Sequence, residues 1–207
     1  MVVNMFSKKI PNILTVARIF LIPVIVVSFY IPGKITNLIV ASLFLAASLT
    51  DYFDGYLARA MKAQSNFGKC LDPIADKLLV AVALIMLIHF SYQDLYITVP
   101  AMIIICREIL VSGLREFLAG INVSVPVTKL AKWKTGIQMT AITLLLLAGE
   151  GSDYTYNEVM DIFEASDFIK SSLDGVIENI GIVLLSVSAF LTVVTGYIYL
   201  KVGLKKM

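Results

Sequence analysis

The chain has 207 residues, of which 58% are hydrophobic and only 15% carry a charge, and its formal net charge is +2. A water-soluble domain of this size has a much lower apolar content, so the composition excludes an ordinary soluble protein. The length predicts a single domain covering residues 1–207, and no nucleic-acid partner is expected.

Six apolar runs dominate the chain, and each is about 20 residues long, enough to cross roughly 30 Å of hydrocarbon as a helix. We therefore predict an all-α, polytopic membrane protein of six transmembrane helices, preceded by a short N-terminal juxtamembrane segment. No cleavable signal peptide is expected, because the first apolar run is too long and lacks a small-residue cleavage site. The expected spans are residues 11–31, 37–59, 72–90, 95–119, 130–149 and 176–200.

Lysines and arginines outside the spans lie mostly on one side of the predicted membrane. Because positively charged connections face the cytoplasm, both termini are expected inside the cell membrane. The other side carries Lys34 and Lys170 and an acidic segment at 150–178, in which no catalytic constellation is evident. The inner set is Lys8, Lys9, Arg59, Lys62, Lys69, Lys129, Lys132, Lys134, Lys201, Lys205 and Lys206.

The first helix is predicted to begin at Pro11, where the missing N–H of proline costs nothing. Asn12, Thr15 and Arg18 follow at three-residue steps and form a polar stripe on an otherwise apolar helix. Two interpretations stay open: Arg18 reaches outward to the lipid headgroups, or the stripe lines a polar cavity inside the bundle.

Four carboxylates stand where the second and third spans meet the inner surface. Asp51 and Asp54 are three residues apart, and Asp72 and Asp76 are four apart. On a helix each pair shares one face, with Cβ atoms about 5–6 Å apart. The polar residues 62–69 between the pairs are predicted to form a loop, so two helix ends would direct all four carboxylates to one place.

Such a cluster needs counter-charge, because even one intramembrane carboxylate costs roughly 2.5–3.5 kcal/mol. Two divalent cations would supply it, and oxygen ligands favour Mg²⁺, Mn²⁺ or Ca²⁺ over zinc. Gly55 lets a ligand approach the backbone, and Arg59 is placed for a bidentate contact with phosphate. Lys77 follows the cluster, and we expect it to reach the headgroups rather than neutralise the carboxylates.

The fourth span carries charges within the predicted membrane. Glu108, Ser112 and Arg115 share one helix face, and Arg107 lies deeper. Intramembrane charges usually face the bundle interior and a partner. One interpretation is that a Glu108–Arg115 pair holds the bundle together; the other is that the arginines form an anion pocket.

The fifth span begins with a cluster of lysines. Lys129, Lys132 and Lys134 flank Trp133, an interfacial anchor, and positive-inside anchoring alone would explain them. Alternatively, Lys132 and Lys134 reach a phosphate in the cavity. Gln138, one turn deeper, could bond a polar ligand.

One motif joins these features. Its spacing, D-x2-D-G-x2-A-R-x8-G-x3-D-x3-D, resembles the signature of the CDP-alcohol phosphatidyltransferases. Capped helices with solvated aspartates would not require the Gly-x2-Ala-Arg insert. The segments PNILTVARIFLIP, CREILVSGLREF and KWKTGIQ resemble the bacterial phosphatidylglycerophosphate synthases of that family. The motif is met by Asp51, Asp54, Gly55, Ala58, Arg59, Gly68, Asp72 and Asp76.

The resemblance implies transfer of a phosphatidyl group from CDP-diacylglycerol to sn-glycerol 3-phosphate, with two divalent cations, Mg²⁺ or Mn²⁺, in a homodimeric enzyme surrounded by membrane lipid. The implied metal ligands are Asp51, Asp54, Asp72 and Asp76, of which Asp76 is also the base. The implied CDP-lipid residues are Gly55, Ala58, Arg59, Gly68, Asn12, Thr15 and Arg18. The implied residues for the acceptor phosphate are Arg107, Arg115, Lys132 and Lys134.

Other functions fit parts of the pattern. A sister transferase acting on inositol phosphate or serine would keep the same aspartate motif. A divalent-cation transporter would place carboxylates near mid-membrane on symmetric half-helices, whereas here they cluster at one surface. A purely structural bundle leaves the four aspartates unexplained.

Overall fold

The described residues of the computed structural model form helices and a few turn residues beside them, with no strand among them. The backbone is described for residues 2–31, 34–60, 66–91, 94–121, 129–149 and 164–204, and side chains for 15–31, 36–50, 71–91, 94–121, 130–149 and 175–203. The all-α prediction is confirmed, and each predicted span falls on one helix. The helices are α1 (Val2–Phe29), α2 (Lys34–Ala60), α3 (Asn66–Phe90), α4 (Leu95–Gly120), α5 (Lys129–Ala148) and α6 (Glu164–Leu204).

Three helix starts differ from the prediction. α1 begins at Val2, so Pro11 lies inside a helix rather than at its start, and the expected juxtamembrane segment is part of α1. α3 begins at Asn66, so the last residues of the predicted 62–69 loop are helical. α6 begins at Glu164, well before residue 176. Hydropathy locates only the apolar part of a helix, whereas backbone hydrogen bonding continues through polar flanks.

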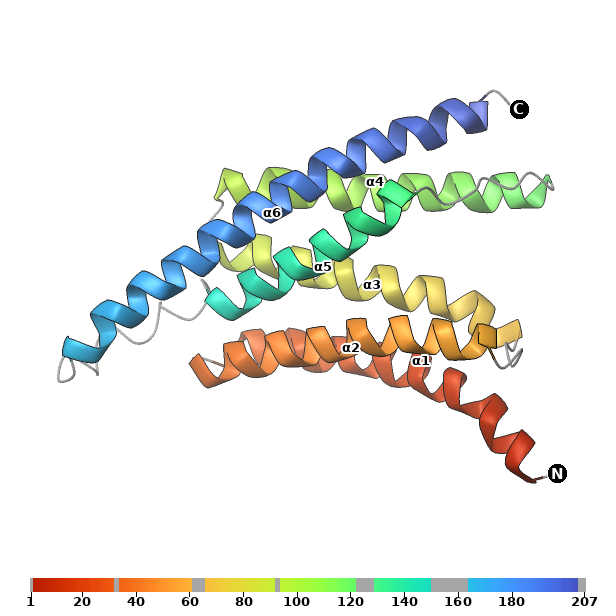
Figure 1. Ribbon diagram of the computed structural model, residues 1–207, viewed down its shortest axis with the longest axis horizontal. Coiled ribbons are helices and arrows are strands. Elements are labelled where there is room, and N and C mark those ends of the chain that lie inside the picture. The colour runs from red at the N-terminus through yellow and green to blue at the C-terminus, as the bar shows by residue number, and fades with distance from the viewer. Residues whose placement is uncertain are drawn as a thin grey trace.

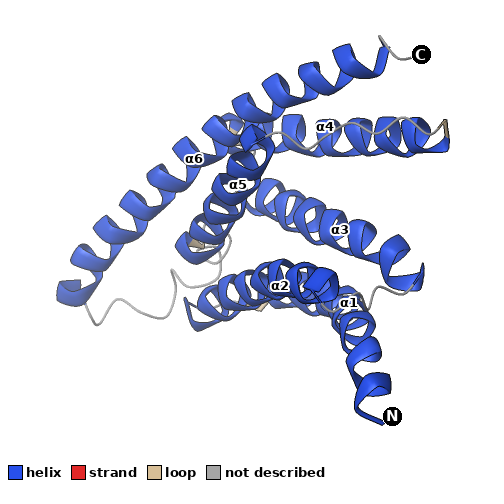
Figure 2. Ribbon diagram, turned by 45° about the vertical axis from the view of Figure 1, so that its right-hand side comes forward, coloured by secondary structure: helices blue, strands red, loops and turns tan. Residues whose placement is uncertain are grey.

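The helices alternate in direction and form one bundle (Figure 1). Both termini lie at the same end, which we call the termini end, together with the end of α2 and the starts of α3 and α5. α1 packs against both α2 and α3, α5 lies between α2 and α6, and α4 packs along α6 (Figure 2). The helix ends that carry the four aspartates of the motif and the lysine-rich start of α5 therefore lie at one end of the molecule.

The core draws on all of the helices, including Ile25 of α1, Phe44 of α2, Leu84 of α3, Ile104 of α4 and Leu185 of α6. The outer surface is also rich in large apolar side chains, which suits lipid better than water. Among the described residues, two helical segments are long and apolar enough to cross a membrane, Leu95–Gly120 and Gly175–Gly203. Shorter apolar stretches cover Thr15–Phe29 and Thr36–Thr50. The six-span arrangement stays a prediction.

Candidate active site

The backbone places the two acidic pairs at one level of the bundle. Asp54 of α2 and Asp72 of α3 each lie about 9 Å from the helix ends that meet at the termini end, at 1.5 Å per residue. Asp51 and Asp76 each lie about 14–15 Å from the same ends. Because α2 and α3 run in opposite directions, the two aspartate pairs lie at the same depth below the termini end. The side chains of Asp51 and Asp54 are outside the described set.

The polar stripe of α1 faces the bundle interior. Thr15 is only 3% exposed, and its hydroxyl donates a hydrogen bond to Oδ1 of Asp72. Arg18, one turn further along, is 4% exposed. An arginine buried to this extent does not extend to the headgroups, so that interpretation is wrong for Arg18, and the lining of a polar cavity by the stripe stays a prediction. The side chain of Asn12 lies outside the described residues.

The donor chemistry of the acidic motif fits a hard divalent cation. Asp72 and Asp76 are partly buried on α3, and a carboxylate that accepts one hydrogen bond from Thr15 retains further lone pairs for a cation. Carboxylate oxygens are the ligands that Mg²⁺ and Mn²⁺ prefer. The residues with described side chains contain no group of three or more potential metal-ligating side chains. That search covers only half of the predicted ligand set, so the metal site stays a prediction.

Gly55, Ala58, Arg59 and Gly68 complete the motif on the same two helices. The first three lie in α2 and Gly68 in the first turn of α3, all near the termini end. Their side-chain surroundings are outside the described residues, so their predicted contacts with the CDP-lipid stay predictions.

Lys77 has a different partner from the one predicted. Its Nζ donates a hydrogen bond to Oγ of Ser112, joining α3 to α4. The expected contact with lipid headgroups is therefore wrong, because Lys77 points into the interface between two helices. This bond holds the helix that carries Asp76 against the helix that carries the intramembrane arginines.

A group of charges lies between α4 and α5, and we call Arg107, Glu108, Arg115 and Lys134 the cation cluster. Lys134 is 3% exposed, and its Nζ contacts Oε1 of Glu108. Arg107 approaches the same oxygen with Nη1 at 3.3 Å. The carboxylate thus pairs with Lys134 and Arg107, and the predicted Glu108–Arg115 pair is wrong.

Helix α6 completes the cation cluster with residues that the sequence analysis did not single out. Arg107 donates a hydrogen bond from Nη2 to Oγ1 of Thr195 at 2.9 Å. The ring of Tyr199 lies 5.8 Å from Cζ of Arg107 and 5.2 Å from Cζ of Arg115, within cation–π range. A Cβ at Gly196 would lie 3.1 Å from Cγ of Arg107, so glycine leaves room for that side chain.

A pattern in α6 could have revealed these residues. The polar side chains recur at helical spacing and so share one face of an apolar helix. All are buried, which marks an interior polar face rather than a lipid-facing one. They are Ser188, Thr192, Thr195 and Tyr199.

The cation cluster and the acidic motif lie close enough to interact electrostatically. The charges that act on Lys134 include those of Glu108, Arg107 and Asp76. Asp76 belongs to the acidic motif of α3, whereas Lys134 lies in the second turn of α5. Asp76 and Lys134 are therefore near enough for their charges to interact, which suits a site for a phosphate ester and a cation.

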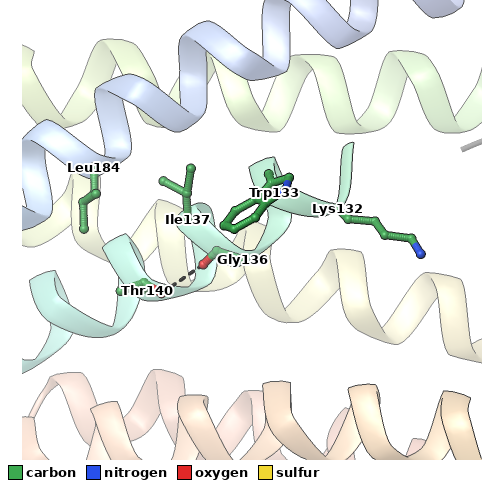
Figure 3. Close-up of a pocket in the computed structure, with 6 residues that line it drawn as sticks. All are labelled: Lys132, Trp133, Gly136, Ile137, Thr140 and Leu184. Atoms are coloured by element: carbon green, nitrogen blue, oxygen red, sulfur yellow. Dashed lines mark hydrogen bonds between the residues drawn. The ribbon is translucent and has the colours of Figure 1, made fainter. Parts of the chain in front are cut away.

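Lys132 lies apart from Lys134 on the surface. Residues two apart on a helix point about 200° away from each other. Lys132 and Trp133 line an open groove of about 430 Å³ between α5 and α6 (Figure 3). This position fits the anchoring interpretation of Lys132, and its predicted contact with the acceptor stays a prediction. The groove is completed by Gly136, Ile137, Thr140 and Leu184.

Gln138 faces the interior one turn deeper than Lys134. It is 3% exposed, and its Oε1 is buried without a hydrogen-bond partner among the described residues. Buried polar atoms are normally paired, so an unpaired amide oxygen at this position is suited to bind a polar ligand or a water molecule.

Comparisons with known proteins agree with this arrangement. The sequence pattern of the CDP-alcohol phosphatidyltransferases matches residues 8–194, and the chain belongs to that family. Three proteins named CDP-diacylglycerol–glycerol-3-phosphate 3-phosphatidyltransferase are among its relatives. Those of Rickettsia bellii and Cereibacter sphaeroides are 45% and 38% identical to it, over 94% and 95% of this chain and 95% and 96% of their own. That of Haemophilus influenzae is 37% identical, over 94% of this chain and 93% of its own. The predicted family is confirmed.

Proposed function

We propose that this protein transfers the phosphatidyl group of CDP-diacylglycerol to sn-glycerol 3-phosphate, giving phosphatidylglycerophosphate and CMP. Relatives that bear this activity in their names align with nearly the whole chain. The structural observation that carries the proposal is the cation cluster beside the acidic motif. Three cations against one carboxylate leave two positive charges, which match a phosphate dianion.

The acyl chains of CDP-diacylglycerol require a membrane enzyme, and the apolar outer surface supports this location. We place the protein in the cell membrane, as a homodimer with both termini and the active site on the cytoplasmic side. The lysine and arginine distribution of the sequence supports the orientation, because the positively charged segments gather at the termini end.

Members of the family generally depend on divalent cations. In the proposed site, two such ions, Mg²⁺ or Mn²⁺, would supply positive charge for the diphosphate and for the departing CMP. Their ligands would be Asp51, Asp54, Asp72 and Asp76.

The chain's own groups would do the rest. Asp76 would accept the proton of the glycerol hydroxyl, whose oxygen attacks the lipid-bearing phosphorus in line while the bond to CMP breaks. Gly55 and Ala58 would let the nucleotide pack against α2, where Arg59 would contact its phosphates, and Asn12, Thr15, Arg18 and Gly68 would line the same cavity.

The two arginines of the cation cluster differ in how many of their N–H groups already donate hydrogen bonds within the protein. Arg107 gives Nη1 to Glu108 and Nη2 to Thr195. Arg115 is exposed and stacks on Tyr199, so its guanidinium edge can meet an incoming phosphate. We therefore assign the direct phosphate contact to Arg115, and place Lys134 and Arg107, which both pair with Glu108, behind it.

The acceptor test is CMP release from CDP-diacylglycerol with a panel of acceptors. We expect release with sn-glycerol 3-phosphate, its loss on treatment with a chelator, and its recovery on addition of Mg²⁺ or Mn²⁺. Release with inositol phosphate or serine instead would identify a sister transferase. Divalent-cation flux in vesicles without CMP release would favour a transporter.

The substitution Arg115→Ala should raise the KM for sn-glycerol 3-phosphate by about 10–100-fold, since a hydrogen bond to a charged group contributes about 1.5–3 kcal/mol. The KM for CDP-diacylglycerol should stay unchanged. Steady-state kinetics with each substrate varied in turn measures both values. Glu116→Ala, next to it and also exposed, is the matched control. Equal losses for both substrates would show that Arg115 is structural.

A further inference from the structure

The buried polar face of α6 makes two kinds of contact with the arginines of α4. Thr195 accepts a hydrogen bond from Arg107, and Tyr199 presents its ring to both Arg107 and Arg115. Both α6 residues are almost fully buried, at 1% and 3% exposed. The last helix is therefore in contact with the cation cluster as well as with the apolar core.

We propose that Thr195 and Tyr199 are positioning residues that set the affinity for the acceptor's phosphate by fixing Arg107 and Arg115. This inference rests on the proposed function and deepens it. Arginine has a long side chain with many rotamers, so an unheld guanidinium binds phosphate less well than one already in place.

The hydroxyl of Thr195 is oriented for this purpose. It donates its own proton to the backbone, with Oγ1 at 2.8 Å from the carbonyl oxygen of Leu191. Its lone pairs are thereby free to accept from Nη2 of Arg107 at 2.9 Å. A serine can reproduce both bonds, whereas a valine of nearly the same shape can make neither.

The ring of Tyr199 acts on both arginines at once. Its centroid lies between 5 and 6 Å from each guanidinium carbon. A phenylalanine keeps the face of the ring and its attraction for cations, whereas a leucine keeps only apolar volume. The exposed Tyr197, two residues earlier on the outer face of α6, provides a matched control.

The inference predicts an effect confined to one substrate. Arg107 and Arg115 belong to α4, whereas the residues expected to bind the CDP-lipid belong to α1, α2 and α3. In the purified full-length enzyme, Tyr199→Leu and Thr195→Val should each raise the KM for sn-glycerol 3-phosphate by about 5–30-fold. The KM for CDP-diacylglycerol should change less than about twofold. Thr195→Ser and Tyr197→Leu should behave like the unmodified enzyme, and Tyr199→Phe, which keeps the ring, should raise this KM less than Tyr199→Leu.

The outcomes separate this inference from the proposed function. An unmodified enzyme that does not use sn-glycerol 3-phosphate would contradict the proposed function. An unmodified enzyme that uses it, with an unchanged KM in Thr195→Val and Tyr199→Leu, would overturn only the positioning role. Equal losses in Tyr199→Phe and Tyr199→Leu would also overturn the role of the ring. If Tyr199→Leu does not fold, the comparison of Thr195→Val with Thr195→Ser decides.

Discussion

Replacing Asp76 with asparagine is expected to lower the turnover number for CMP release by about 10²–10⁴-fold, the usual contribution of a general base. An amide is nearly isosteric with a carboxylate, but it cannot accept the proton of the attacking hydroxyl. Asp76 lies on α3, one turn from Asp72, and its charge acts on Lys134 of the cation cluster. Because asparagine keeps the shape of the side chain, substrate binding should be preserved, as measured by the KM for CDP-diacylglycerol.

Asp76 is proposed both as base and as metal ligand, and the two roles can be separated. If the loss came only from weaker cation binding, excess Mg²⁺ would restore turnover in Asp76→Asn; a missing base is not restored in this way. Asp94→Asn is the matched control, because Asp94 caps α4 with a bond to the backbone of Tyr96, and asparagine caps a helix equally well. Turnover retained in Asp76→Asn would remove the base assignment.

Replacing Glu108 with glutamine is expected to lower the free energy of unfolding by about 3 kcal/mol. This is the lower end of the usual cost of removing one partner of a buried ion pair. The reason is that Lys134 is 3% exposed and would lose its carboxylate, as would Arg107. Thermal unfolding of the detergent-solubilised protein measures the change. Glu116→Gln, an exposed position on the same helix, should unfold at the temperature of the unmodified protein.

A double-mutant cycle tests whether the cost comes from the pair itself. Lys134→Met removes the buried ammonium, so the double variant Glu108→Gln/Lys134→Met should be more stable than the sum of the two single changes predicts. Purely additive effects would show that Glu108 stabilises the bundle by some route other than Lys134.

Most of the helical architecture could be predicted from the sequence, because each apolar run is long enough for a span and short polar segments separate the runs. The starts of α3 and α6 could not, because Asn66 and Glu164 begin helices in polar sequence, and the start of α1 could not, because Ser7, Lys8 and Lys9 separate Val2 from the first long apolar run. Hydropathy carries no signal there.

The charged residues of the candidate site could be predicted from the sequence, but the residues with which they pair could not. Asp72 and Lys134 were identified from motif spacing and from their position in the spans. The pairing of Lys77 with Ser112, and of Glu108 with Lys134 rather than Arg115, depends on how each helix is rotated about its axis. Sequence periodicity fixes which residues share a face, but it does not fix which neighbouring helix that face meets.

The length of α6 has a consequence for the far side of the membrane. Its 41 residues extend about 60 Å, and even a tilt of about 40° leaves it longer than the hydrocarbon layer. Figure 1 shows its first turns projecting past the other helices, at the end opposite both termini. In the proposed orientation, several helical turns would stand in the extracytoplasmic compartment, where an antibody or a protease could reach them in intact spheroplasts without access to the catalytic side.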